Sequence, residues 1–292
     1  MSGPNPSEIA RTTDWFELLS LTRASERLGR SVMSRVLEER APDLDEAGAE
    51  VLIDDVLAEV ERRTSLGGAL YAFSRGTTGL QRGEQTSEAQ LLYTFLVLSS
   101  AHAPFRQNKS GFHPGRLFER VAASALEAWT AGTAVVFADI DESGVRARID
   151  HLGRRLNVAS SSEKARKRRK DHGLDVAAWR EFGDRRAGYP VVLCQCTIAW
   201  KLVEKAREVQ VGEWGGMLDV REGTFTAAIA APHALDPDYE HWDELRRNTD
   251  LILERTRLLA LLGNVHEPWA PLLSSAQSIV DGLADWQGAQ TL

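Results

Sequence analysis

The chain has 292 residues, of which 43% are hydrophobic and 26% are charged, and its formal net charge is -7. This composition is typical of a globular protein with one large or two smaller domains. Because the overall negative charge repels phosphate, any contact with nucleic acid requires a local basic patch. The sequence shows neither a signal peptide nor an apolar run long enough to span a bilayer, so we expect a soluble, cytoplasmic protein without a membrane partner.

The two cysteines, Cys194 and Cys196, are two positions apart in a predicted strand. Their side chains would point to the same face, a geometry that does not favour a disulfide between them, and a reducing compartment would leave both as small buried thiols. No second cysteine pair or histidine pair accompanies them, which argues against a zinc site. The sequence also lacks a P-loop, a dinucleotide-binding fingerprint and a hydrolase nucleophile elbow.

The first third of the chain is dominated by helical periodicity. Apolar residues recur at helical spacing over residues 8–30 and, more regularly, over 45–63, while residues 86–101 are apolar on several faces. Residues 64–84 contain several glycines and predict turns. These patterns predict a helical N-terminal domain over residues 1–110.

After residue 110 the pattern changes to alternating helices and strands, which predicts an α/β (α+β) domain over residues 111–292 with a mixed sheet and a helical C-terminal tail. The strands are rich in β-branched and aromatic residues, and the GDRRAG segment has hairpin-turn chemistry. The expected elements, in chain order, are a helix at 114–130, a strand at 133–139, a helix at 145–156, a strand at 173–181, the turn at 183–188, a strand at 189–198, a helix at 199–211, a strand at 224–230, and helices at 237–262 and 270–286.

Three polar residues occupy notable places in this order: Glu119 in GRLFERVAAS, Asp175 in HGLDVAAW and Gln195 in VVLCQCTIAW. With them, the segment 114–231 resembles the PD-(D/E)XK nuclease family, which has an acidic residue in its first helix, an aspartate on the second strand and E-x-K or Q-x-K on the third. The GLDVAAW strand followed by a strand ending in QC is similar to nuclease-like proteins of bacterial anti-phage defence loci.

The resemblance implies a restriction-endonuclease-like fold and a Mg²⁺- or Mn²⁺-dependent endonuclease that cleaves DNA, working with other subunits of a defence complex. It implies that Asp175, Glu119 and Gln195 bind the metal. A hard cation of this kind prefers oxygen ligands and retains several waters, so few protein ligands suffice. The possibility of a homo-oligomer stays open.

The lysine of the family motif is missing, because position 197 is Thr197. The following predicted helix offers Lys201, which we take as the preferred substitute in the catalytic set with Asp175, Gln195 and Glu119, and Lys205 as the second choice. Loss of the lysine leaves an alternative open, in which the protein is a catalytically lapsed nuclease-fold adaptor that binds nucleic acid or protein partners.

A basic run, EKARKRRKDH, ends three residues before Asp175. Most charge runs are solvated surface, but in an acidic protein a cluster beside a predicted metal strand favours phosphate binding. The predicted DNA-binding residues are Lys164, Arg166, Lys167, Arg168, Arg169 and Lys170. Taken singly, Asp175 also fits a hydrogen-bonded strand residue and Glu119 a solvated helix position, whereas a buried Gln195 needs partners.

Overall fold

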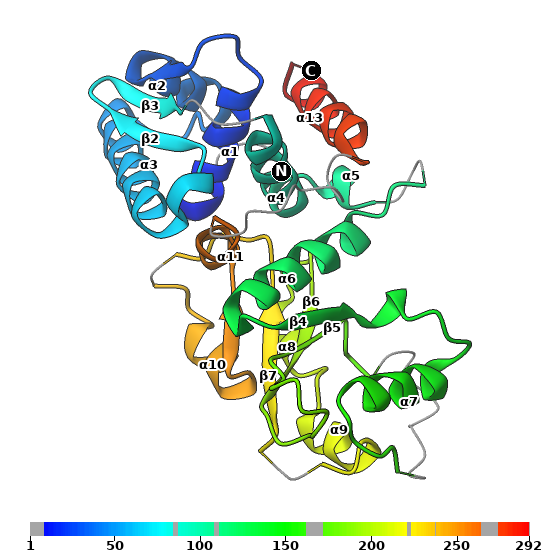
Figure 1. Ribbon diagram of the computed structural model, residues 1–292. Coiled ribbons are helices and arrows are strands. Elements are labelled where there is room, and N and C mark those ends of the chain that lie inside the picture. Colours follow the sequence, from blue (N-terminus) through cyan, green and yellow to red (C-terminus); the bar gives the residue numbers. More distant parts are fainter. Residues whose placement is uncertain are drawn as a thin grey trace. The chain divides into compact units, whose positions relative to one another are not determined.

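The structure, a computed structural model, divides into two compact units (Figure 1). Unit 1 comprises Met1–Pro114, Pro232–Pro237 and Glu254–Leu292, and unit 2 comprises Gly115–Ala231 and Asp238–Leu253. The predicted boundary after residue 110 lies close to the first crossing between them, but the chain later returns, so that residues 254–292 belong to unit 1. The structure describes residues 9–83, 87–107, 111–161, 172–220, 223–236, 238–263 and 274–291.

Unit 1 is mainly helical, as expected, and its longest helix is set by local sequence. The predicted helix at 45–63 forms α3 (Glu46–Gly67), which begins where the Asp45 side chain accepts a hydrogen bond from the Gly48 backbone N at 2.8 Å. The other helices of the unit are α1 (Ile9–Leu21), α2 (Arg30–Arg40), α4 (Ser87–Ala101), α5 (Ala103–Arg106), α11 (Arg255–Leu262) and α13 (Ala276–Thr291), with a 3₁₀ turn, η1, at Gly68–Leu70.

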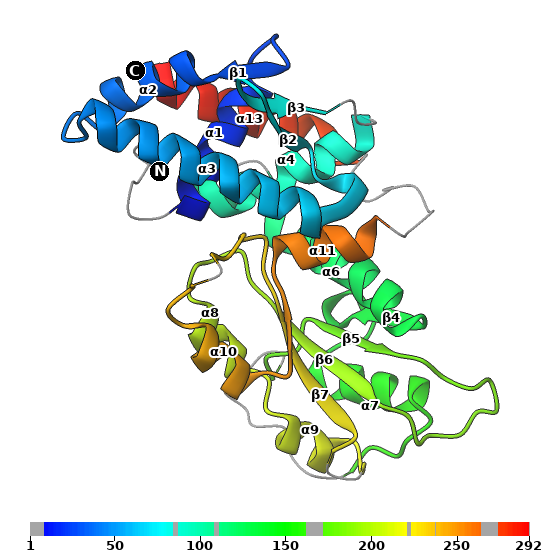
Figure 2. The same cartoon turned by 90° about the vertical axis from the view of Figure 1, so that its left-hand side faces the viewer.

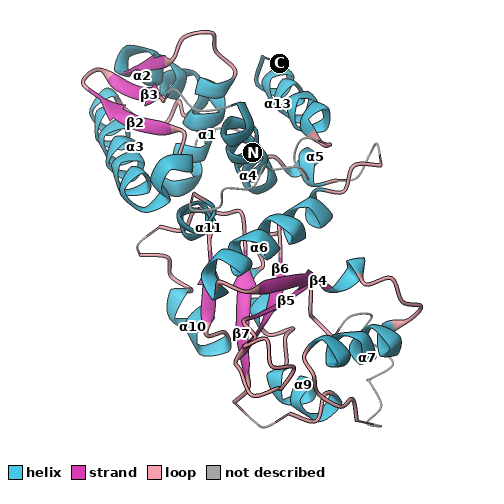
Figure 3. Ribbon diagram, viewed as in Figure 1, coloured by secondary structure: helices cyan, strands magenta, loops and turns pink. Residues whose placement is uncertain are grey.

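Unit 1 also contains an antiparallel sheet that the sequence did not predict (Figure 3). The order is β1 (Arg27–Gly29), β3 (Gly79–Arg82), β2 (Phe73–Gly76). The helix predicted over 8–30 therefore ends at Leu21, and the predicted turns at 64–84 include a hairpin. The three strands are short and each contains a glycine, a residue that is depleted in strands. Gly79 is required in this sheet, because its φ is +148° and a Cβ would lie 2.3 Å from the Leu28 carbonyl oxygen.

A buried charge network lies at the centre of unit 1. Arg63 donates to Asp14 at 2.7 Å, to Glu17 at 3.1 Å and to Glu59 at 2.7 Å, and its side chain has no exposed surface. Arg255 donates to both carboxylate oxygens of Asp14, at 2.6 and 2.8 Å. These contacts join α1, α3 and α11, which are far apart in the sequence, so the network fixes how the helices of unit 1 pack.

Unit 2 is built on a five-stranded mixed sheet of order β4-β5-β6-β7-β8 (Figure 2). The first two pairings, β4–β5 and β5–β6, are antiparallel, and β6–β7 and β7–β8 are parallel. The β5–β6 pair is the predicted hairpin, closed by the loop that contains the GDRRAG turn. The strands are β4 (Thr133–Val136), β5 (Val176–Trp179), β6 (Val191–Cys196), β7 (Phe225–Ala230) and β8 (Leu251–Leu253).

The helices of unit 2 match the prediction in part. Helix α6 (Pro114–Thr130) has the predicted bounds, and α7 (Val145–Arg155) ends one residue early. The helix predicted over 199–211 is limited to α8 (Leu202–Ala206), and α9 (Val211–Met217), which begins where the prediction ended, was not predicted. The tail predicted over 237–262 contains β8 between α10 (Trp242–Asn248) and α11. The last residues of the predicted strand 133–139 form a 3₁₀ turn, η2 (Phe137–Asp139).

One face of this sheet packs on α7 and α9. Leu193 and Ala177 on the strands form a buried core with Leu152 of α7 and Trp214 of α9. Because alternate residues of a strand share a face, Gln195 lies on the same face as Leu193, while Cys194 and Cys196 lie on the other. Among the helices that the structure describes, none has the length and apolar character needed to cross a membrane.

Candidate active site

Asp175 and Gln195 meet at one end of the β5–β6 pair. Val176 is opposite Cys194 in the ladder, and the Asp175 backbone N donates to the Cys194 carbonyl at 3.0 Å, which places Asp175 opposite Gln195. Residues opposite each other in an antiparallel pair point to the same face. The expectation that these two residues lie on paired strands with side chains on one face is confirmed, since Gln195 Nε2 donates to Asp175 Oδ2 at 2.5 Å.

The Asp175 carboxylate is held in one orientation. Its Oδ2 accepts from Gln195 Nε2 and from the Cys196 backbone N, the latter at 2.7 Å. Gln195 Nε2 also donates to the Cys196 carbonyl at 3.1 Å, so both partners of the amide nitrogen are acceptors. This arrangement orients the amide with its nitrogen toward Asp175 and leaves Oε1 as the atom of Gln195 that is able to bind a cation.

Glu119 comes from the first turns of α6 and is paired with an arginine. Arg116 Nη1 donates to Glu119 Oε2 at 2.9 Å, and the Glu119 side chain is largely buried, with 15% of its surface exposed. Arg116 Nη2 also reaches the Ala138 carbonyl at 3.5 Å. Ala138 follows Phe137, whose backbone N donates to the Asp175 carbonyl at 2.8 Å. These contacts bring the helix pair Arg116–Glu119 to the strand that carries Asp175.

The thiol of Cys196 has a raised pKa. Burial raises the pKa of its thiol well above the usual value, and a hydrogen bond with Cys194 and the charges of Cys194, Asp175 and Glu119 raise it further. Both cysteines are free, as predicted, and a thiol held neutral is neither a nucleophile nor a ligand for a soft metal.

The two candidate lysines, Lys201 and Lys205, do not contact Asp175 or Gln195, which the resemblance implied for the catalytic lysine. Lys201 is the N-cap of α8, its side chain is 72% exposed, and its Nζ lies 3.4 Å from Glu204. Lys205 pairs with Glu208 at 3.0 Å. The contacts of both ammonium groups are thus with acidic residues of their own segment, rather than with Asp175 or Gln195.

Thr197 follows the last residue of β6 and closes the strand. Its hydroxyl accepts from the Ala199 backbone N at 3.1 Å, and its own backbone N donates to the Ala230 carbonyl at 3.0 Å. The side chain is therefore engaged in a local turn. It supplies no positive charge where the family motif has its lysine.

His172, three residues before Asp175, is buried against α9. Its backbone has a φ of +52°, its ring packs edge-on against Trp214, and its Nδ1 lies 3.7 Å from Glu213 Oε2. Trp214 Nε1 donates to the His172 carbonyl at 3.4 Å. His172 thus anchors the segment that leads into β5. The predicted DNA-binding residues Lys164 to Lys170 lie outside the described residues.

The donor set suits a hard cation. No group of three or more His, Cys, Asp and Glu side chains that could hold a metal occurs among the described residues. The predicted set of Asp175, Glu119 and Gln195 contains two carboxylates and one amide, all oxygen donors. Mg²⁺ and Mn²⁺ accept such a set because they retain several waters, whereas zinc prefers a tetrahedral nitrogen and sulfur set.

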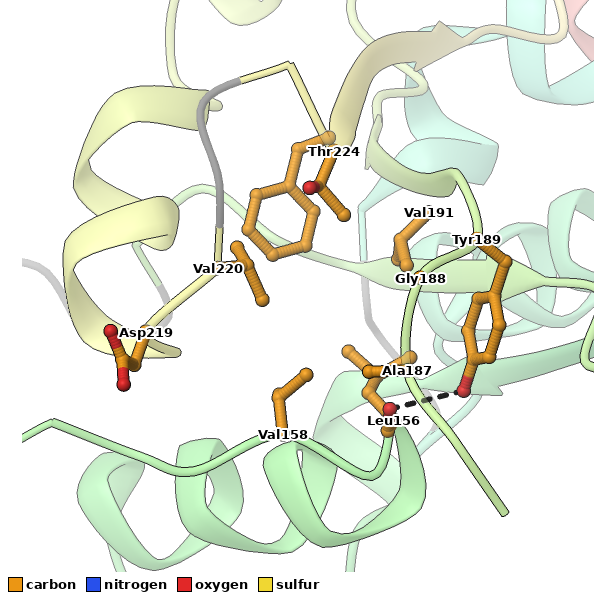
Figure 4. A pocket seen from close by; sticks show the side chains of 10 residues that line it. Leu156, Val158, Ala187, Gly188, Tyr189, Val191, Asp219, Val220 and Thr224 are labelled. Atoms are coloured by element: carbon orange, nitrogen blue, oxygen red, sulfur yellow. Dashed lines mark hydrogen bonds between the residues drawn. The ribbon is translucent and has the colours of Figure 1, made fainter. Parts of the chain in front are cut away.

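A separate cavity lies at the other end of the same sheet (Figure 4). It has a volume of about 330 Å³ and reaches Val191 and Phe225, the first residues of β6 and β7. Its polar groups include the Tyr189 hydroxyl, which already donates to the Leu156 carbonyl at 3.1 Å. Val191 is four residues from Gln195, about 13 Å along an extended strand, so the cavity is distinct from the carboxylate site.

Comparison with known proteins gives no match. No family model matches the chain, and no curated protein or solved structure does so either.

Arg116 is the residue of this site that the sequence interpretation missed. It stands three positions before Glu119, the spacing at which helix side chains pair, and that spacing was the available signal. Its proximity to Asp175 depends on the packing of α6 against the strands, which no local pattern encodes.

Proposed function

We propose that the protein is a Mg²⁺- or Mn²⁺-dependent nuclease that hydrolyses phosphodiester bonds of DNA at the site formed by Asp175, Gln195 and Glu119. The observation that carries this proposal is the Asp175–Gln195 contact at the end of two paired strands. Glu119 of α6 is connected to the same region through Arg116, which contacts the Ala138 carbonyl. The sheet order supports it, since an antiparallel meander followed by a parallel strand is the order expected for a PD-(D/E)XK-like core. Partners in an anti-phage defence complex are proposed on the sequence resemblance alone.

Asp175, Glu119 and Gln195 Oε1 would hold the metal, which supplies Lewis-acid stabilisation of the phosphate charge and acidifies a bound water. In the proposed hydrolysis, a water oxygen would form the new bond to phosphorus as the bond to the leaving sugar oxygen breaks. One water proton goes to the leaving oxygen, and the other is released to solvent from the new phosphate monoester. The hydrogen bonds to Asp175 Oδ2 keep its carboxylate oriented throughout.

A second candidate function has one observation in its favour. Lys201 is exposed and paired with Glu204, and Thr197 supplies no charge. Neither of the two positions considered for the family lysine, Lys201 and Thr197, therefore places a positive charge beside Asp175. A nuclease-fold adaptor that binds nucleic acid or protein without cutting does not need this lysine, so its absence fits such a protein. The adaptor would not need divalent metal, and this distinguishes it from the enzyme.

The test is incubation of the protein with plasmid, linear and single-stranded DNA in Mg²⁺ or Mn²⁺, with and without EDTA. We expect metal-dependent cleavage that Asp175→Ala reduces at least about 1,000-fold, because the variant removes the main metal ligand. Lys201→Ala is the comparison variant and should keep most of the activity. Absence of cleavage in every arm would favour the adaptor.

The basic run gives a separate prediction from sequence. Replacing Lys167, Arg168, Arg169 and Lys170 with glutamate should weaken DNA binding and flatten its dependence on salt, because each phosphate contact releases counterions. The measurement is the dissociation constant for duplex DNA by fluorescence anisotropy at several salt concentrations. The same four-residue replacement leaving the affinity and the salt slope unchanged would show that the run is solvated surface.

A further inference from the structure

The carboxylate site has a cation beside it that belongs to α6. Arg116 donates through Nη1 to Glu119 at 2.9 Å and through Nη2 to the Ala138 carbonyl at 3.5 Å. Ala138 is one residue beyond Phe137, which is hydrogen-bonded to the backbone of Asp175. The guanidinium therefore bridges the helix and the strand segment next to Asp175. At 45% exposure, the side chain is open to solvent and able to meet a ligand.

We propose that Arg116 supplies the positive charge that contacts the scissile phosphate at this site, in place of the lysine that the family motif would provide. This inference rests on the proposed nuclease function. A guanidinium is planar and its paired N–H groups match phosphate oxygens, so it stabilises the charge that develops during attack on phosphorus. It stays protonated and transfers no proton, so the protons of the attacking water go to the leaving oxygen and to solvent.

The contacts support this placement. The guanidinium of Arg116 reaches Glu119, and it also reaches the carbonyl of Ala138, whose neighbour Phe137 is hydrogen-bonded to the Asp175 backbone. The same positive charge opposes a divalent cation bound to Asp175 and Glu119, which gives the inference a readout besides cleavage.

Arg120 provides a matched control on the same helix. It lies one turn beyond Arg116, is 51% exposed, and pairs with Asp139 at 3.2 Å. Both arginines have a carboxylate partner and similar exposure, but Arg116 pairs with Glu119 of the candidate site, whereas Arg120 pairs with Asp139. A nonspecific loss of surface charge would affect the two variants equally.

The experiment compares wild type, Arg116→Ala, Arg116→Lys and Arg120→Ala by Mn²⁺ binding in calorimetry and by DNA cleavage at saturating Mn²⁺. We expect Arg116→Ala to bind Mn²⁺ several-fold more tightly and to cut at least about 100-fold more slowly, since transition-state charge loses its partner. Arg116→Lys should recover part of the rate, and Arg120→Ala should stay within about 2-fold of wild type in both measurements.

The outcomes separate the inference from the function on which it rests. If wild type cuts DNA and Arg116→Ala matches Arg120→Ala in metal affinity and rate, the role of Arg116 is refuted while the nuclease stands. If wild type neither binds Mn²⁺ nor cuts, both proposals fail together. Faster cleavage or weaker metal binding in Arg116→Ala would also overturn the inference.

Discussion

Arg63→Met is expected to lower the free energy of unfolding by about 4 kcal/mol, because removing one partner of a buried ion-pair network leaves uncompensated charge. Arg63 has no exposed side-chain surface and donates to Asp14, Glu17 and Glu59. Methionine fills a similar volume but satisfies none of these acceptors. Urea unfolding followed by circular dichroism measures the change.

Arg62 is the matched control, since it neighbours Arg63 and pairs with the same Glu59 at 2.6 Å but is 25% exposed. Arg62→Met should cost about 1 kcal/mol, because solvent screens a partly exposed pair. Adding Glu17→Gln to Arg63→Met should restore part of the loss by removing a buried charge. Equal losses for the two arginine variants would contradict a central role for the network.

The same network predicts how the stability of unit 1 falls at acid pH. Burial raises the pKa of Asp14, but the charges and hydrogen bonds of Arg255 and Arg63 outweigh it and hold the pKa at about 2, below the usual 3.8. A depressed pKa contributes stability above the unfolded-state value and loses it as the pH falls. Wild type should therefore lose this contribution between about pH 4 and pH 2, and Arg63→Met should lose it at higher pH.

Gln195→Glu is expected to make the stability of the protein depend on divalent metal. The substitution replaces the amide donor, 2.5 Å from Asp175 Oδ2, with a second carboxylate. Two carboxylates at that distance repel each other, so the free energy of unfolding should fall by about 2 kcal/mol in EDTA. Mn²⁺ should restore it, and its affinity should rise at least about 10-fold, because the added charge is a metal ligand.

Gln195→Met is the control for this change. It also removes the hydrogen bond to Asp175 but adds no ligand, so metal should not restore the lost stability. Thermal unfolding of both variants with EDTA and with Mn²⁺ separates the two effects. If Mn²⁺ fails to stabilise Gln195→Glu more than Gln195→Met, the two side chains do not share a cation site.

Element type was predictable where the sequence pattern is long. Helices α3 and α6 have three turns or more of regular apolar spacing, α4 is a long run that is apolar on several faces, and β5 to β7 are β-branched or apolar strands. The strands β1 to β3 are short and each contains a glycine, a residue that is depleted in strands, and β8 is a three-residue strand inside a segment of helical pattern. The segment between α8 and α9 lies close to Gly173, where a Cβ would be 2.3 Å from the Glu208 carbonyl oxygen, and such a tertiary contact has no local sequence signal.

Part of the candidate site was also predictable from the sequence. Asp175 and Gln195 were identified through the family resemblance, and the β5–β6 register places them opposite each other. The basic side chain of the site was not predictable. Lys201 follows Gln195 closely in sequence, but its ammonium group pairs with Glu204. Arg116 is far from Asp175 in sequence, and α6 brings it near through packing.

The most direct test is the stoichiometry of Mn²⁺ binding by calorimetry in wild type, Asp175→Asn and Asp250→Asn. Asp250 is a fitting control because it too immediately precedes a strand and accepts a backbone hydrogen bond, from the Ala227 N at 3.0 Å. We predict that wild type and Asp250→Asn bind Mn²⁺ and that Asp175→Asn loses this binding. Unchanged binding in Asp175→Asn, or none in wild type, would contradict a metal site at Asp175.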